Sequence, residues 1–246
     1  MTDETPLARR ILALIDLTSL NSTDTEESVT ALAALASTPA GRVAAVCIWA
    51  RFIAVARERL KGTGVPIAVV ANFPDGSSDV HGAADETAKA VANGANEVDV
   101  VFPYRALLSG DNATGVTLVR ACREACGPKA LLKVILETGQ LATAERIRQA
   151  SELAIEGGAQ FLKTSTGKTQ PGATVPAAAV MLDAIESART RGITVGFKAS
   201  GGIGTIAAAQ AYLELYEKRL GAGTATPATF RIGASSLLKP VLAALS

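Results

Sequence analysis

The chain has 246 residues with 24 basic and 23 acidic side chains, so its formal net charge is +1. This length suits one large domain around a single core, and a charge near zero provides no basic surface for nucleic acid or an anionic membrane. No apolar run approaches the roughly 20 residues that a membrane span needs, and the N-terminus is too polar for a secretory signal, so we expect a cytoplasmic protein that binds a small ligand.

Short β-branched runs alternate with longer, Ala-rich amphipathic segments along the whole chain. In chain order, the predicted strands are Leu12–Leu17, Val43–Ile48, Ile67–Asn72, Glu97–Val101, Leu131–Glu137, Phe161–Thr164, Thr194–Lys198 and Phe230–Gly233. Helices predicted between or after them include Glu26–Ser37, Arg51–Leu60, Asp79–Asn93, Ala142–Glu156, Pro176–Arg191, Ile203–Leu220 and Ser236–Leu245.

Glycines punctuate this alternation. Gly94, Gly157–Gly158, Gly192 and Gly221 follow predicted helices and suit the left-handed position after a helix end. Parallel βα units can close as a barrel or form an open, doubly wound sheet. Eight pairs without a GxGxxG motif after the first strand favour the barrel. We therefore predict a single (β/α)₈ TIM-barrel domain over residues 1–246.

Alternation within each strand predicts which side chains point into the barrel. Phe197 suits the helix layer, which turns Lys198 inward, and an inward Lys163 would bring Phe161 inward as well. The same reasoning places further side chains on the inner side, at or near the C-terminal strand ends: Asp16, Cys47, Asn72, Asp99, Lys133 and Glu137. Enzymes of this fold act from these positions.

Several ionisable groups at one barrel mouth need an explanation, because an unpaired buried charge is costly. Catalysis is one explanation. The alternative is that these groups are solvated or form ion pairs that hold loops together, and it applies better to Glu137 and Asn72 than to Lys198 and Asp99. Cys47 alone would be a core residue, and beside the others it becomes a candidate for the pocket wall.

Lys163 and Lys198 end consecutive predicted strands. Neighbouring strands lie about 4.8 Å apart, so lysines at equal heights can approach each other. A lysine attacks a carbonyl only as the free amine, which is rare at neutral pH because its ordinary pKa is about 10.4. A second ammonium nearby and partial burial would lower that pKa, so the pair predicts a Schiff-base nucleophile.

Two turns of small residues follow the last two strands: KASGGIG at 198–204 and GASS at 233–236. Loops at these places commonly bind phosphate in this fold, because small residues let backbone N–H groups approach an anion. The two turns together predict a phosphate site, with ordinary turn chemistry as the alternative.

Cysteine and histidine carry little of the predicted chemistry. Cys122 and Cys126 lie one helical turn apart without a second ligand pair nearby, so we expect them to pack as small hydrophobic side chains rather than hold a metal. His81, the one histidine, follows capping residues and should be exposed in the first turn of a helix. Lysine and carboxylate remain as the reactive groups.

Runs of residues carry a family resemblance. They are IDLTSLN (15–21), VCIWARFI (46–53), NFPDG (72–76), EVDVVFPYRAL (97–107), LLKVILETG (131–139), FLKTSTGK (161–168), VGFKASGGI (195–203) and RIGASSLL (231–238). Together they resemble deoxyribose-phosphate aldolases of the longer bacterial type, almost from end to end. The pairing of FLKTSTG with GFKASGG is highly specific to that family.

The resemblance implies reversible cleavage of 2-deoxy-D-ribose 5-phosphate to acetaldehyde and D-glyceraldehyde 3-phosphate, without a metal or organic cofactor. It implies that Lys163 forms the Schiff base, Lys198 is the second lysine, Asp99 is the acid/base carboxylate and Asp16 belongs to a proton relay. Positions on the substrate and phosphate side are Lys168, Gly201, Gly202, Ser235 and Ser236, with Cys47 and Lys133 as further substrate-side candidates.

The sequence departs from the family at three places. Many members of this type carry a C-terminal tail ending in tyrosine, whereas this sequence ends in VLAALS, so we expect slower enamine protonation. Gly204 stands where a relative has arginine and Ala199 where proline is common, which predicts a weaker grip on phosphate.

Rival readings are another Schiff-base barrel, such as a transaldolase or a bisphosphate aldolase, and a noncatalytic barrel that binds sugar phosphates. The first would extend the pocket, and the second would be expected to lose the lysine pair or the carboxylate. Expected partners are small phosphorylated sugars and aldehydes, with no nucleic acid or membrane. The sequence leaves a homodimer open.

Overall fold

The computed structural model describes residues 4–246, so residues 1–3 of the predicted domain lie outside the described chain. Eight parallel strands form a closed barrel: β1 (Ile15–Thr18), β4 (Ala45–Ile48), β5 (Ile67–Ala71), β6 (Glu97–Val101), β7 (Leu131–Ile135), β8 (Phe161–Lys163), β9 (Gly196–Ser200) and β10 (Phe230–Ala234). Pairing of β1 with both β4 and β10 closes the sheet. The predicted (β/α)₈ TIM barrel is confirmed.

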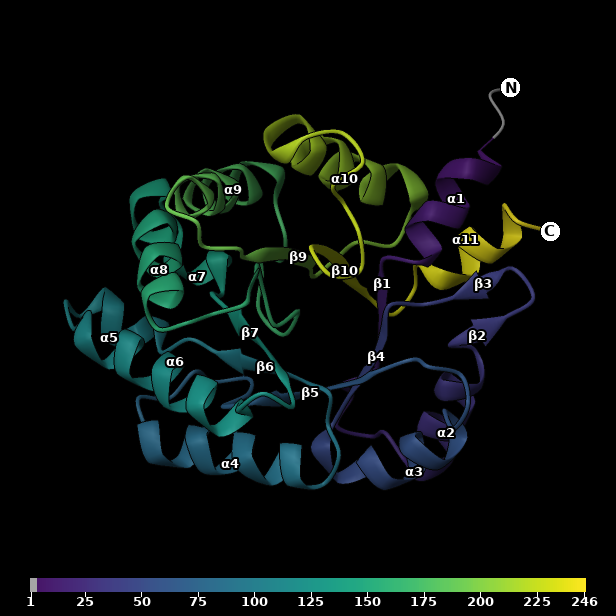
Figure 1. The fold of residues 1–246 in the computed structure, drawn as a ribbon, viewed down its shortest axis with the longest axis horizontal. Helices are drawn as coiled ribbons and strands as arrows, with labels where there is room; N and C mark the ends of the chain where they lie inside the picture. Colours follow the sequence, from purple (N-terminus) through teal and green to yellow (C-terminus); the bar gives the residue numbers. More distant parts are fainter. Residues whose placement is uncertain (1–3) are drawn as a thin grey trace.

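Helices surround the barrel on its outside (Figure 1). They are α1 (Thr5–Leu12), α2 (Glu26–Ala34), α3 (Ile53–Arg59), α4 (Val80–Ala92), α5 (Tyr104–Leu108), α6 (Ala113–Cys126), α7 (Thr138–Leu141), α8 (Ala144–Glu156), α9 (Val175–Thr190), α10 (Ile206–Leu220) and α11 (Leu238–Ala243). A 3₁₀ turn at Ala50–Phe52 precedes α3, and a small hairpin joins β2 (Ser37–Thr38) to β3 (Gly41–Arg42). Helices α1 and α11, near the two chain ends, pack together.

Several predicted boundaries were wrong. Leu12 ends α1 and does not begin a strand, because Pro6 starts a helix whose buried side includes Ile11 and Leu12. Strand β9 begins at Gly196 and runs two residues beyond Lys198. The predicted strand that ends at Glu137 stops at Ile135, since Glu137 has a left-handed backbone (φ 57°).

Two predictions about single residues are confirmed. Cys122 and Cys126 are buried, unpaired thiols on α6. His81 is exposed in the first turn of α4, where the Asp79 side chain accepts a hydrogen bond from Gly82 N.

Four of the five glycines expected at helix ends have a positive φ, which is the left-handed backbone that was predicted for them. They are Gly94, Gly158, Gly192 and Gly221, and Gly157 is the exception.

The main hydrophobic core lies between the strands and the helix layer. A smaller apolar cluster lies apart from it. It is formed by Leu20, which follows β1, and by residues of β4 and β5, namely Ala45, Cys47, Ala68 and Val70. Elsewhere the barrel interior carries most of the buried charged side chains of the protein, beside the Phe161 ring. Within residues 4–246, no helix is long and apolar enough to cross a membrane, and no group of three or more His, Cys, Asp or Glu is arranged to hold a metal ion.

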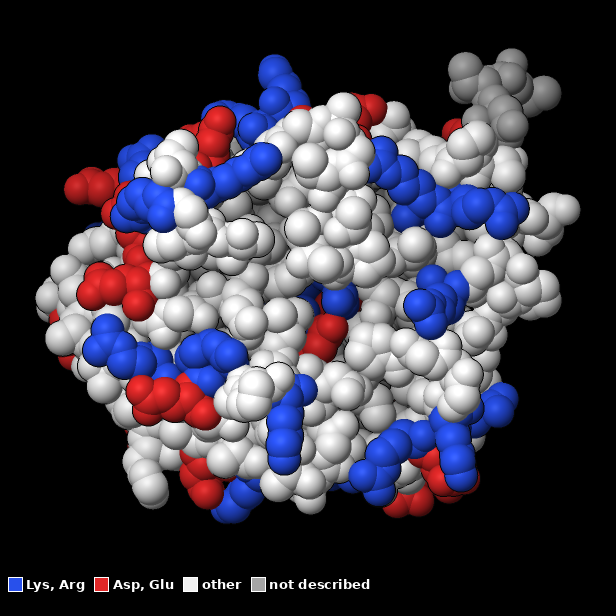
Figure 2. Space-filling model, in the orientation of Figure 1, with Lys and Arg blue, Asp and Glu red and all other residues white. Residues whose placement is uncertain are grey.

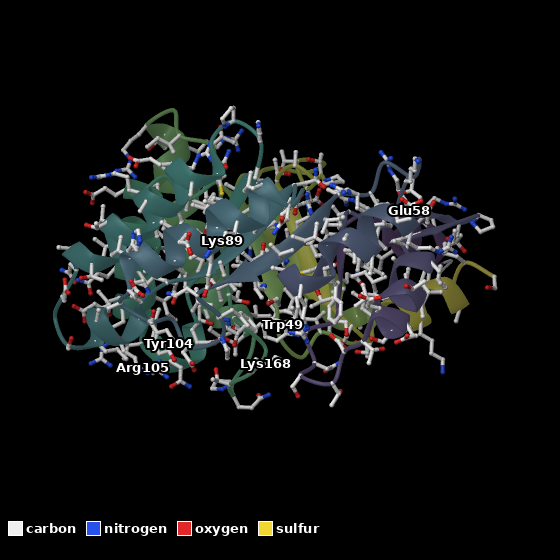
Figure 3. The ribbon with its side chains drawn as sticks, turned by 90° about the horizontal axis from the view of Figure 1, so that it is seen from below. Trp49, Glu58, Lys89, Tyr104, Arg105 and Lys168 are labelled. Carbon is white, nitrogen blue, oxygen red and sulfur yellow. The ribbon has the colours of Figure 1, made fainter. Side chains whose placement is uncertain are left out.

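The strands all point toward one edge of the molecule. In Figure 3, Trp49, Tyr104 and Lys168, which follow β4, β6 and β8, lie along that edge, and Glu58, which precedes β5, lies at the other. The C-terminal strand ends and their loops therefore form one face, which is where barrel enzymes place their active sites.

Candidate active site

Seven charged side chains fill the inside of the barrel, and each residue is at most 5% exposed. They come from β1, β6, β7, β8, β9 and β10, and we call them the charged network: Asp16, Glu97, Asp99, Lys133, Lys163, Lys198 and Arg231. Alternation along each strand explains the arrangement, because residues two apart, such as Glu97 and Asp99, share the inner side.

Asp99 connects three lysines. Its Oδ2 accepts hydrogen bonds from Lys163 Nζ at 2.8 Å and from Lys198 Nζ at 2.7 Å, and its Oδ1 accepts one from Lys133 Nζ at 2.8 Å. Lys163 and Lys198 are in direct register on β8 and β9. The structure thus brings together the two lysines and the carboxylate that the sequence had placed on the inner side, at or near C-terminal strand ends.

The other half of the network lies closer to the N-terminal strand ends. Arg231 contacts Glu97 with both terminal nitrogens, at 2.8 and 3.3 Å, and donates to Asp16 Oδ1 at 2.6 Å. Lys133 Nζ lies 2.5 Å from Glu97 Oε2, and Lys198 Nζ lies 2.5 Å from Asp16 Oδ2. Asp16 and Lys133 therefore join the two halves.

Two glycines make room for these side chains. A Cβ at position 196 would lie 2.5 Å from the Phe161 ring, and one at position 233 would lie 2.9 Å from Lys198 Cε. Phe161 is thus inside the barrel with Gly196, as the strand alternation predicted, and the Arg231 guanidinium lies over its ring at 5.8 Å.

The four cations of the network differ in the direction in which their pKa values are shifted. Burial lowers the pKa of Lys163 and the Lys198 ammonium lowers it further, which together outweigh the opposing effect of Asp99. Burial also opposes the charged form of Lys198, but Asp16 and Asp99 outweigh it and raise the pKa of Lys198. The pKa values of Lys133 and Arg231 are raised against burial by their carboxylate partners. Lys163 is the network cation that loses its proton most easily.

The two aspartates remain ionised. Burial alone would raise their pKa values, but Lys133, Lys163 and Lys198 hold the pKa of Asp99 well below its usual range. Lys198, Arg231 and Lys133 likewise lower the pKa of Asp16. Both side chains are therefore carboxylates at neutral pH.

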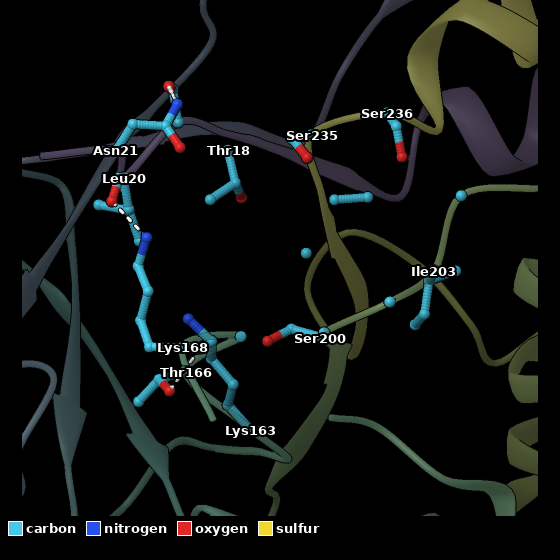
Figure 4. A pocket seen from close by; sticks show the side chains of 17 residues that line it. Thr18, Leu20, Asn21, Lys163, Thr166, Lys168, Ser200, Ile203, Ser235 and Ser236 are labelled. Carbon is cyan, nitrogen blue, oxygen red and sulfur yellow. Dashed lines mark hydrogen bonds between the residues drawn. The ribbon is translucent and has the colours of Figure 1, made fainter. Parts of the chain in front are cut away.

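A cavity of about 340 Å³ opens above the network among the loops that follow β1, β8, β9 and β10 (Figure 4). Of the seven network residues, Lys163 alone lines it. In Figure 4, Lys163 lies at one end of the cavity, and Ser235 and Ser236 lie at the other. A molecule bound here reaches the Lys163 amine while Lys198 and Lys133 stay completely buried.

Small residues line the wall opposite Lys163. Gly201 and Gly202 have positive φ values of 101° and 85°, which favour glycine, and a Cβ at Gly204 would lie 2.9 Å from Ser236 Oγ. The loops after β9 and β10 therefore pack closely, with Ser235 and Ser236 exposed beside them. Backbone N–H groups and hydroxyls in such a wall can bind an anion.

Lys168 closes another side of the cavity. Its ammonium donates to Leu20 O at 2.6 Å, and so links the loop after β8 to the loop after β1. Below it, Thr166 Oγ1 accepts from Lys168 N at 3.0 Å and donates to the buried Glu137 carboxylate, which also accepts from Thr166 N at 3.3 Å. Glu137 thus holds the loop that carries Lys168.

Cys47, Lys133 and Asn72 are among the predicted residues that do not line the cavity. Cys47 and Lys133 are completely buried and are not among the residues that line it, so neither forms the pocket wall in this structure, and their place on the substrate side stays a prediction. Asn72 holds its own turn instead of pointing into the mouth: its Nδ2 donates to Ser77 O and Val101 O, and its Oδ1 accepts from Ser77. For Asn72 and Glu137, the alternative of a loop-holding role describes the geometry.

Glu97 and Arg231 were missed at the sequence level. The predicted site residues lie at or near the C-terminal ends of strands, whereas Glu97 begins β6 and Arg231 is the second residue of β10. A signal was nevertheless present. Each lies two residues before an inward-facing position, Asp99 and Gly233 respectively, and so belongs to the inner side of its strand.

Residues 10–240 match the model of the DeoC/LacD family of aldolases. A deoxyribose-phosphate aldolase candidate from Toxoplasma gondii ME49 is 26% identical, with a TM-score of 0.88 over 98% of this chain and 96% of that one. A second candidate, from Coccidioides immitis, is 32% identical, with a TM-score of 0.84 over 96% of this chain and 86% of that one. The tetrameric deoxyribose phosphate aldolase of Aeropyrum pernix is 25% identical, with a TM-score of 0.76 over 99% and 92%.

Proposed function

The chain belongs to the DeoC/LacD family of aldolases, and from this membership we propose that it reversibly cleaves 2-deoxy-D-ribose 5-phosphate to acetaldehyde and D-glyceraldehyde 3-phosphate through a Schiff base on Lys163. One observation carries the choice of lysine: Lys163 is the network cation that both lines the cavity and has a lowered pKa. The deoxyribose-phosphate aldolases among the similar structures support the choice of substrate.

Covalent catalysis begins with the free amine. Neutral Lys163 attacks the C1 aldehyde carbon of the open-chain sugar, and loss of water gives an iminium at Nζ. The iminium carries a fixed positive charge where a neutral amine stood. Asp99 Oδ2, 2.8 Å from Nζ in the free enzyme, is placed to stabilise that charge.

Cleavage then moves an electron pair toward the iminium. The C3 hydroxyl loses its proton as the C2–C3 bond breaks, its electrons form the C1–C2 double bond of an enamine, and glyceraldehyde 3-phosphate leaves. Asp99, directly or through a water molecule, accepts the proton. Because Asp99 also contacts Lys198 at 2.7 Å, and Lys198 contacts Asp16, a proton can pass along these three groups and return to C2 of the enamine. Hydrolysis of the resulting iminium releases acetaldehyde.

The far wall of the cavity would hold the phosphate. Gly201, Gly202, Ser235 and Ser236 provide small residues and hydroxyls, and Lys168 provides a positive charge from the loop after β8. In the free protein the Lys168 ammonium is bound to Leu20 O, so contact with phosphate would exchange one acceptor for another. This one anion-binding wall in a cavity of about 340 Å³ fits a sugar with a single phosphate.

Trapping tests this proposal directly. The protein is incubated with acetaldehyde and borohydride, and the adduct is located by peptide mass spectrometry. We expect one adduct, on the peptide containing FLKTSTGK, and release of acetaldehyde from 2-deoxyribose 5-phosphate by the untreated enzyme. An adduct on Lys198, or activity that is lost on chelation of metal ions, would contradict the assignment.

A further inference from the structure

The cations of the charged network differ in how many carboxylates they contact. Arg231 contacts Glu97 and Asp16, and Lys198 contacts Asp16 and Asp99. Lys133 contacts Glu97 and Asp99 closely and lies 3.8 Å from Asp16.

Lys163 contacts one carboxylate, Asp99, and shares the same oxygen with Lys198. It is therefore the least compensated cation of the network.

The number of charges explains this difference. Among the described residues of the network there are four basic side chains, Lys133, Lys163, Lys198 and Arg231, and three carboxylates, Asp16, Glu97 and Asp99. Charges buried together are stable when they balance, so one cation in excess favours the release of one proton. The geometry decides which cation releases it.

We propose that Arg231 and Glu97 are positioning residues for the proposed Schiff-base reaction: Arg231 occupies Asp16 and adds the fourth buried cation, which favours the free amine at Lys163, and Glu97 offsets part of that excess charge. The inference rests on the proposed function and adds to it the origin of the free amine. Arginine is suited to this task, because its guanidinium stays charged at every physiological pH and binds carboxylates with two nitrogens. A lysine at position 231 could release the proton itself.

Neither residue can act on the substrate directly. Glu97 and Arg231 do not line the cavity, and each is 5% exposed. Figure 2 views the opposite face, where the strands begin, and shows acidic and basic atoms together in a hollow at its centre. The effect on Lys163 must therefore pass through the ion pairs of Lys133, Asp16 and Asp99.

Other ionisable groups near Lys163 do not change the count. Cys47 lies close enough to interact with four groups of the network, but burial raises the pKa of its thiol, which stays neutral. These groups are Lys198, Asp99, Lys163 and Asp16. Lys168 lies at the rim, with its ammonium on Leu20 O, outside the network. The balance therefore depends on the seven network residues.

The test measures the pH at which Lys163 becomes reactive. Acetaldehyde is the probe because it has no titratable group, whereas 2-deoxyribose 5-phosphate titrates near neutral pH. The rate of adduct formation on Lys163, trapped with cyanoborohydride and normalised to a free lysine derivative, is recorded against pH for the full-length protein. Its midpoint follows the pKa of the Lys163 amine.

Two single variants should move this midpoint in opposite directions. Arg231→Met leaves three lysines for three carboxylates, so Lys163 keeps its proton more firmly and the midpoint should rise by on the order of one pH unit. Glu97→Gln keeps the shape of the side chain and leaves four cations for two carboxylates, so the midpoint should fall by a similar amount. The double variant, with three cations and two carboxylates, should return near the wild-type midpoint.

An exposed ion pair offers matched controls. Arg219 on α10 pairs with Asp183 on α9, and the two side chains are 37% and 38% exposed. Arg219→Met and Asp183→Asn make the same changes in charge outside the barrel and should leave the midpoint in place, because solvent screens exposed charges.

The outcomes separate the inference from the function on which it rests. If the wild-type protein forms no adduct on Lys163 at any pH, the proposed function is wrong and the inference falls with it. If the adduct forms but Arg231→Met and Glu97→Gln leave the midpoint unmoved, or move it the same way, the positioning role is wrong and the Schiff base stands. Should Arg231→Met fail to fold, Glu97→Gln decides: a lower midpoint supports the inference, and an unchanged or higher one overturns it.

Discussion

The inside of the barrel and the loops above it are built in opposite ways. The charged network is made of long side chains that are fixed on strands, contact one another at 2.5–3.8 Å and are almost completely buried. The cavity wall after β9 and β10 is made of glycines and serines on loops, with Gly202, Ser235 and Ser236 exposed.

This contrast assigns two tasks to two regions. Reactivity comes from charges that cannot rearrange, and selection of the substrate comes from a wall that a ligand can reach. Substitutions in the network should therefore affect every aldehyde alike, whereas substitutions in the wall should affect phosphorylated substrates alone.

The largest effect should follow loss of the nucleophile. Lys163→Met keeps the length of the side chain but removes the amine, so cleavage of 2-deoxyribose 5-phosphate should fall by roughly 10⁴-fold or more and trapping of acetaldehyde should disappear. Steady-state kinetics and intact-mass spectrometry measure both. Lys168→Met removes a lysine from the rim and should still form the adduct. Residual trapping in Lys163→Met, located on Lys198, would reverse the roles of the two lysines.

A smaller but pH-dependent loss should follow removal of the second lysine. Without Lys198, three cations face three carboxylates and Lys163 no longer shares Asp99 Oδ2 with a second ammonium, so the pKa of Lys163 should rise. Its free amine, present in wild type at a pH below the ordinary lysine pKa, should then appear only at higher pH. Lys198→Leu should lose about 10²-fold in adduct formation at pH 7 and recover part of it above pH 9. An unshifted profile would show that burial alone lowers the pKa of Lys163.

At the cavity wall, the effect should depend on the substrate. Ser236→Asp introduces a negative charge beside Gly204, where we place the phosphate, so KM for 2-deoxyribose 5-phosphate should rise by roughly 10- to 100-fold. KM for unphosphorylated deoxyribose should change by less than about twofold, because that substrate has no charge to repel. Ser187→Asp, at an exposed position of α9, controls for the added charge. Equal losses on both substrates would move the phosphate elsewhere.

Sequence patterns predicted the parts of this molecule that repeat. Alternation of apolar residues located all eight strands, and the parity of Lys163, Lys198 and Asp99 placed them inside the barrel. The bounds of β6 were predicted without error because no turn residue blurs Glu97–Val101. The spacing of apolar residues predicts the strands because every βα unit packs its strand against the helix layer in the same way.

The misses have local causes. Helix α1 was not predicted because the apolar residues at its end, up to Leu12, are followed almost directly by those of β1. One apolar stretch of sequence therefore belongs to both a helix and a strand. Glu137 was assigned to a strand because its left-handed backbone leaves no mark in residue type. The depth of Lys133 depends on its pairing with Glu97, a contact across 36 positions of sequence that no local pattern contains.

The smallest effect should come from the residue that joins the two regions. Glu137 is completely buried and follows a barrel strand, yet its carboxylate holds Thr166, whose hydroxyl in turn accepts from Lys168 N. Glu137→Gln keeps the shape of the side chain but replaces one of the two acceptor oxygens with an amide, so one contact to Thr166 should be lost at a cost of about 1 kcal/mol.

The loop that carries Lys168 should then be less well held, and KM for 2-deoxyribose 5-phosphate should rise by about two- to fivefold while kcat changes little. The decisive measurement is the pH midpoint of acetaldehyde trapping on Lys163. It should stay at the wild-type value, because Glu137 contacts no member of the charged network in the described part of the chain. A midpoint that moved would mean that Glu137 contributes to the charge balance around Lys163. Glu137 would then belong to the reactive interior of the barrel and not to the loops that select the substrate.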